Sequence, residues 1–125
     1  MQSTTEAEET LRLYALLRAD LSMPPGKLAS QAGHAFLGAY LSADGPRRAA
    51  YDQFGLGTKV CLSVPNLPVL LRAFDAARTR GLPCFLVEDT GRNTTFHGVP
   101  TLSAVGIGPL FPPEAQFLRR YALHP

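Results

Sequence analysis

Residues 11–17 form an almost uninterrupted apolar run, and this run constrains the fold more than any other feature of the sequence. A strand with one face in water alternates apolar and polar residues, whereas a strand covered on both faces is apolar throughout. The run therefore predicts a strand with structure packed on both sides. The stretch that follows contains Pro24, Pro25 and Gly26, which continue neither a strand nor a helix and predict a turn.

From Lys27 to about residue 42 the pattern changes to the period of an α-helix. Lys27, Gln31 and His34 fall within about 60° of each other on one side of this helix. A different side gathers apolar residues: Leu28, Ala32, Ala35, Phe36 and Ala39. The many alanines and glycines predict that the helix backbone closely approaches a sheet or another subunit.

The rest of the chain predicts an alternation of strands and helices. The expected elements are strands over residues 59–64, 83–87 and 99–107, a helix over 67–79, and a short helix or a loop between 46 and 57. Helices between the first three strands predict that these run parallel, and the last strand, with no helix before it, is expected to be antiparallel. The predicted fold class is α/β, a three-layer α/β/α arrangement with a mixed four-stranded sheet whose last strand is antiparallel.

Residues 1–10 are polar and lack apolar periodicity, which predicts a disordered leader before a single domain over residues 11–125. The sequence shows neither a secretory signal nor a run of about 18 apolar residues, so we expect a cytoplasmic chain without a membrane span. Cys61 and Cys84 lie in apolar segments, which predicts buried free thiols rather than a disulfide or a metal site. We expect no metal and no cofactor.

The net charge of +2 is unevenly distributed along the chain. Three of the ten acidic residues, Glu6, Glu8 and Glu9, lie in the first ten positions, which contain no Lys or Arg. The remaining residues therefore carry a net charge of +5. This excess is compatible with a polyanionic partner such as nucleic acid, because Lys and Arg neutralise phosphates.

Two polar segments are expected to meet at one edge of the sheet. Ligands of such sheets bind beyond the carboxyl ends of the parallel strands. The first strand leads to Lys27 and the third leads to Asp89, so both residues belong to that edge. Taken singly, each residue also has a purely structural interpretation. Lys27 can be an exposed lysine, Asp89 a turn residue, and His34 a packed or surface histidine. Their convergence with Gln31 predicts a site.

Four segments resemble the archaeal and eukaryotic type (type 2) peptidyl-tRNA hydrolases: residues 18–23, 26–35, 88–92 and 101–109. The similarity runs in order from about residue 11 to residue 123. Its most specific part is the pattern GKxAxQxxHA from Gly26 to Ala35, followed later by a DxGRxT-like element.

The resemblance implies metal-free hydrolysis of the ester between a nascent peptide and the terminal ribose of tRNA, usually by a homodimer. It implies catalytic roles for Lys27, Asp89 and Thr101. Asp89 would orient or deprotonate a water molecule, Lys27 would hold the oxyanion or a phosphate, and Thr101 would supply a hydrogen bond. Substrate-binding roles are expected for four further residues: Gln31, His34, Arg92 and Thr94. Arg92 would contact the tRNA backbone.

The chain departs from this family near the expected site. Thr90 follows the aspartate where the family usually has Ala, and Asn93 separates the arginine from Thr94. Pro24-Pro25 and Val99-Pro100 also replace the usual residues. These departures leave two other interpretations open. One is a non-catalytic RNA-binding or protein-interaction module of the same fold, and the other is an esterase for another acylated small molecule.

Overall fold

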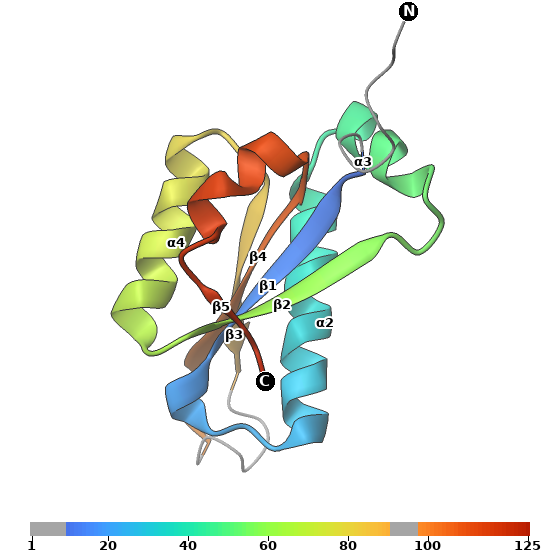
Figure 1. The fold of residues 1–125 in the computed structure, drawn as a ribbon. Coiled ribbons are helices and arrows are strands. Elements are labelled where there is room, and N and C mark those ends of the chain that lie inside the picture. Colours follow the sequence, from blue (N-terminus) through green and yellow to red (C-terminus); the bar gives the residue numbers. More distant parts are fainter. Residues whose placement is uncertain (1–9, 91–97) are drawn as a thin grey trace, which may run out of the picture.

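The computed structural model describes residues 10–90 and 98–125, which form one mixed sheet with helices on both faces (Figure 1). The strands are β1 (Arg12–Arg18), β2 (Thr58–Val64), β3 (Cys84–Asp89), β4 (Thr101–Leu110) and β5 (Ala122–Leu123). The helices are α2 (Pro25–Ser42), α3 (Gly45–Asp52) and α4 (Leu67–Thr79), with two 3-10 helices, η1 (Ala19–Leu21) and η2 (Pro112–Leu118).

The alternating side chains of β1 divide the core between the two faces of the sheet. Ala15 and Leu17 pack with the buried alanines of α2 on one face. Tyr14 and Leu16 pack on the other face with α4 and η2. The three-layer arrangement is therefore confirmed, and β1 is covered on both sides, as its apolar sequence predicts.

The sheet order is β3-β4-β1-β2-β5. β1 pairs with β2 in parallel, and β4 pairs antiparallel with both β1 and β3, so β1, β2 and β3 run in the same direction as predicted. The predicted count of four strands is wrong, because β5 pairs with β2 at Leu62 and Ser63. A strand of two residues is too short to produce a recognisable period in the sequence.

The segment after α2, which the sequence leaves open between a short helix and a loop, contains a helix. Asp44 caps α3, because its side chain accepts a hydrogen bond from the Arg47 N–H at 2.8 Å. η2 was not predicted from the sequence.

Helix α2 lies unusually close to β4. A Cβ atom added to Gly106 would lie 1.8 Å from the carbonyl oxygen of Ala35, so only glycine fits at that position of the strand. Ala35 and Ala39 are fully buried at this contact. Of the two partners expected for the small residues of α2, the sheet is the one observed, and this contact fixes the helix that carries Lys27 and Gln31.

The remaining expectations have different outcomes. Apart from Thr10, the predicted leader lies outside the described residues. Cys61 and Cys84 are free and half-buried, and burial raises the pKa of each thiol. None of the described helices is long and apolar enough to cross a membrane.

Candidate functional site

Lys27 and Asp89 meet at the edge of the sheet where the sequence places them. Lys27 lies in the first turn of α2 and Asp89 is the last residue of β3, and the ammonium group of Lys27 forms an ion pair with Oδ2 of Asp89. The side chains are only 14% and 7% exposed. Ions shielded from water to this degree are retained in proteins when they are paired and hydrogen-bonded.

Gln31 is the second donor to the Asp89 carboxylate. Its Nε2 donates to Oδ2 of Asp89 at 3.2 Å, and its Oε1 accepts a hydrogen bond from the Ser103 hydroxyl. Gln31 is 1% exposed and Ser103 is fully buried. The Ser103 donor fixes which end of the Gln31 amide faces Asp89, because a hydroxyl hydrogen requires the amide oxygen as its acceptor.

Ser103 was not predicted as a site residue. It lies in β4 where the pairing with β3 shifts register between Val87 and Glu88. The signal in the sequence is a serine two residues after Thr101, in a strand that is otherwise apolar. Without the register of β3 and β4, that signal does not indicate which helix residue the hydroxyl contacts.

The start of α2 supports the negative charge of Asp89. Pro24 is the N-cap and Pro25 the first helical residue, a position that suits proline because its missing N–H has no acceptor there. The first turn contains no acidic residue. The positive end of the helix dipole therefore lies at the ion pair and favours the Asp89 carboxylate.

Thr101 lies beside this cluster, and His34 lies in the next turn of α2 after Gln31. Thr101 is paired with Asp89 in the register of β3 and β4, and its hydroxyl donates to the carbonyl oxygen of Val99 at 2.8 Å. His34 is exposed, with Nε2 at 3.4 Å from the Ser30 hydroxyl oxygen. The structure thus brings Lys27, Gln31 and Asp89 together and places Thr101 next to them. Arg92 and Thr94 lie outside the described residues.

Arg18 ties the end of β1 to the start of β4 at the same edge. Its Nη1 donates to the carbonyl oxygen of Leu102 at 3.0 Å, and its Nη2 lies 2.8 Å from Oδ2 of Asp20. The hydrogen bonds from Arg18 lower the pKa of Asp20. Arg18 therefore helps to hold the end of β1 against the start of β4, next to the cluster.

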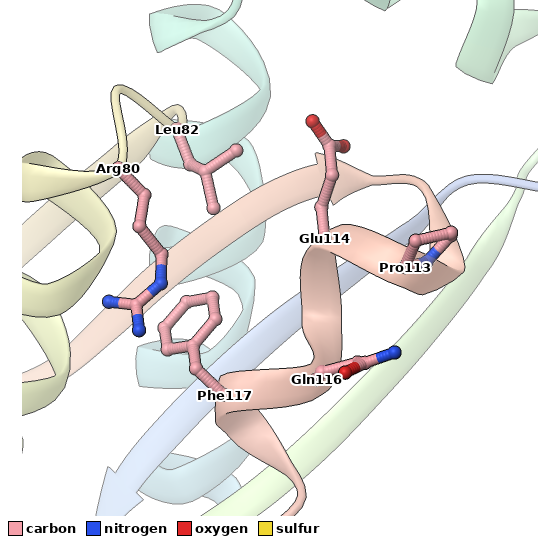
Figure 2. Close-up of a pocket in the computed structure, with 6 residues that line it drawn as sticks. All are labelled: Arg80, Leu82, Pro113, Glu114, Gln116 and Phe117. Carbon is pink, nitrogen blue, oxygen red and sulfur yellow. The ribbon is translucent and has the colours of Figure 1, made fainter.

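A cleft of about 600 Å³ lies at the other end of the sheet, between the end of α4 and η2. Figure 2 shows the Arg80 guanidinium beside the Phe117 ring, and the distance to the ring centroid is 4.5 Å. Glu114, also at this cleft, is paired with Arg47. These polar groups have structural partners and do not converge on a common point. In residues 10–90 and 98–125, no three His, Cys, Asp or Glu side chains lie close enough to hold a metal ion.

Comparison with known proteins identifies relatives across most of the chain. The family model described as peptidyl-tRNA hydrolase PTH2 matches residues 11–115. The peptidyl-tRNA hydrolase of Methanocaldococcus jannaschii is 35% identical over 101 residues, which cover 79% of this chain and 86% of that protein. The peptidyl-tRNA hydrolase of Methanococcus vannielii is 41% identical over 96 residues, covering 75% of this chain and 81% of that protein.

Proposed function

The chain belongs to the peptidyl-tRNA hydrolase PTH2 family, and we propose that its Lys27–Asp89 pair is the centre at which it hydrolyses the ester between peptide and tRNA. The observation that carries this assignment is the ion pair itself, which is shielded from water and hydrogen-bonded to Gln31 at the carboxyl end of β3. Hydrolysis of an ester needs a group that accepts a proton from water and a group that stabilises negative charge on the carbonyl oxygen. Asp89 and Lys27 supply these two groups.

In the proposed reaction, Asp89 accepts a proton from a water molecule while the water oxygen bonds to the acyl carbon of the peptide. Lys27 stabilises the oxyanion that forms on the former carbonyl oxygen. The bond from carbon to the ribose oxygen then breaks, and the proton held by Asp89 passes to that oxygen. The products are a free peptide and uncharged tRNA, and none of these steps uses a metal ion.

The neighbouring residues are given supporting roles in this proposal. Gln31 holds the Asp89 carboxylate, with Ser103 fixing the Gln31 amide. Thr101 contributes to catalysis from its position opposite Asp89. Substrate-binding roles are proposed for His34, Arg92 and Thr94. On the family resemblance, we also propose a cytoplasmic homodimer.

The test is a deacylation assay with an N-blocked aminoacyl-tRNA, in the presence of a chelator and without added metal. We expect release of the acyl group, with inhibition by uncharged tRNA. Salt-dependent tRNA binding without cleavage would instead favour a non-catalytic RNA-binding module. Cleavage of simple esters without inhibition by tRNA would favour an esterase for another acylated molecule. Loss of activity in the chelator would contradict the metal-free mechanism.

A further inference from the structure

A second cleft, of about 590 Å³, begins beside the site and lies between α2 and β3. Its lining residues come from these two elements: His34, Leu37, Gly38, Leu41 and Ser42 from α2, and Phe85, Leu86, Val87 and Glu88 from β3. Neither the proposed reaction nor the core of the protein accounts for it.

The cleft ends next to the site, at His34 and Glu88, because α2 and β3 run side by side in opposite directions. Lys27 and Gln31, early in α2, contact Asp89 at the end of β3. Further along the helix, Gly38 lies against Phe85 near the start of β3, and a Cβ atom on Gly38 would lie 2.2 Å from the Phe85 ring. A molecule that extends from the Asp89 carboxylate along α2 therefore enters this cleft.

The lining of the cleft suits an apolar chain and not a polyanion. Leu37 is 58% exposed, Leu41 is 60% exposed and Phe85 is 42% exposed, so three large apolar side chains face water along one groove. Among the residues that the structure describes, no Lys or Arg lines the cleft, and Glu88 does. A phosphate backbone is attracted by cations and repelled by carboxylates. The RNA side of the substrate is therefore disfavoured here.

The backbone of β3 is a second reason to expect a peptide in this cleft. Within the described part of the chain, β3 is an edge strand that pairs only with β4. The outer edge of such a strand can bind an extended peptide through main-chain hydrogen bonds, which do not depend on the peptide sequence. This mode of binding suits a hydrolase whose substrates carry many different peptides.

We propose that the cleft between α2 and β3 holds the peptide of peptidyl-tRNA, with its main chain along β3 and apolar side chains on Leu37, Leu41 and Phe85. The proposal rests on the function proposed above and names the part of the substrate that this cleft binds.

The geometry also predicts how long a peptide must be to reach each leucine of the cleft. At about 1.5 Å per helical residue, Leu37 and Leu41 lie about 9 and 15 Å beyond Gln31. An extended peptide advances about 3.3 Å per residue, so it reaches them at about its third and fifth residues from the ester.

The experiment compares a single N-acetylated aminoacyl-tRNA with a tRNA that carries six apolar residues. In Leu41→Gln we expect KM for the long substrate to rise roughly fivefold, because the apolar contact is lost, while KM for the short substrate stays unchanged. In Leu37→Gln the rise should already appear with a peptide of four residues. Leu71→Gln is the matched control, because Leu71 is an exposed leucine of α4 on the opposite face of the sheet, and it should leave both substrates unchanged.

Three results would overturn the proposal. The first is an equal change for short and long substrates. The second is a cleft variant that cleaves the long substrate at the wild-type rate but sediments as a monomer, while the wild type sediments as a dimer. In that case the cleft is an interface between two copies of the chain. The third is failure of the wild type to cleave either substrate, which rejects the proposed function itself. Unchanged kinetics on the short substrate verifies that each variant is folded.

Discussion

Ser103 donates its hydroxyl hydrogen to Gln31, and this bond turns the amide nitrogen of Gln31 toward Asp89. The three side chains come from β4, α2 and β3, so the orientation of one carboxylate depends on three elements of the fold. Lys27 reaches the same carboxylate oxygen from the first turn of α2. Among the described residues, a buried polar network thus holds the site.

Replacing Ser103 with alanine should weaken both the fold and the reaction. The change leaves Oε1 of the buried Gln31 without its donor, which costs about 1–3 kcal/mol of unfolding free energy. It also permits the Gln31 amide to rotate away from Asp89, so we expect kcat to fall severalfold. Urea unfolding and the deacylation assay measure the two effects.

Ser63→Ala in β2 is the control for this change. Ser63 contributes no side-chain hydrogen bond in the described residues, so this variant should preserve kcat. Normal kcat in Ser103→Ala would show that the orientation of Gln31 does not matter for the reaction.

Lys27 and Asp89 should behave as a unit in kinetics. We expect Lys27→Ala and Asp89→Asn each to lower kcat/KM at least about tenfold, equivalent to about 1.4 kcal/mol of transition-state stabilisation. Because the two groups form one ion pair and act in the same step, the double variant should be little slower than the slower single variant. Single-turnover cleavage of N-acetylated aminoacyl-tRNA by all four proteins gives the coupling energy. Full activity in both single variants would mean that the reaction takes place at another site. If the loss in the double variant equals the product of the two single losses, Lys27 and Asp89 act independently.

The sequence predicts the parts of this site that follow from a period or from the end of a strand. Lys27, Gln31 and His34 share a side of the helix because of their spacing, and Asp89 follows from the end of an apolar segment. To predict Ser103 as a site residue, one must know the register of β3 and β4, which shifts between Val87 and Glu88. The short strand at Ala122–Leu123 depends on tertiary contact with β2 alone. Local patterns therefore predicted the helix that carries Lys27 and Gln31, and long-range pairing determined which residues surround it.

Gly106→Ala should displace α2 from the sheet. The added Cβ atom would lie 1.8 Å from the carbonyl oxygen of Ala35, which is part of a helix backbone and has little freedom to move. We expect a loss of roughly 1–3 kcal/mol in unfolding free energy, typical of overpacking, and lower kcat because Lys27 and Gln31 shift with the helix. Thermal unfolding and the deacylation assay test this pair of effects.

Gly33→Ala is the matched control for that change. Gly33 lies in the same helix, and a Cβ atom there would have nothing within 4 Å. Because alanine favours the helix over glycine, this variant should be more stable by about 0.5–1 kcal/mol, with unchanged kcat. Equal effects of the two substitutions would contradict the close contact between α2 and β4.

Glu114→Gln should lower stability at neutral pH and have less effect in acid. Arg47 approaches both carboxylate oxygens of Glu114, at 2.6 and 3.0 Å, and its hydrogen bonds lower the pKa of Glu114 below its ordinary value of 4.5. A carboxyl with a lowered pKa in the folded state stabilises the fold above its unfolded pKa, and this contribution is lost as the pH falls through the folded pKa.

Since both side chains of this pair are partly exposed, water and salt screen it, and we expect the variant to lose only about 0.5–1 kcal/mol at pH 7. The difference from the wild type should shrink steadily below pH 4.5 in urea unfolding curves measured at several pH values. Asp75→Asn is the control, because Asp75 forms no ion pair with any described residue, and it should change stability by no more than about 0.5 kcal/mol at any pH. A constant difference between Glu114→Gln and the wild type across the pH range would mean that the introduced amide disturbs packing, so the charge on Glu114 would not be what stabilises the contact between α3 and η2.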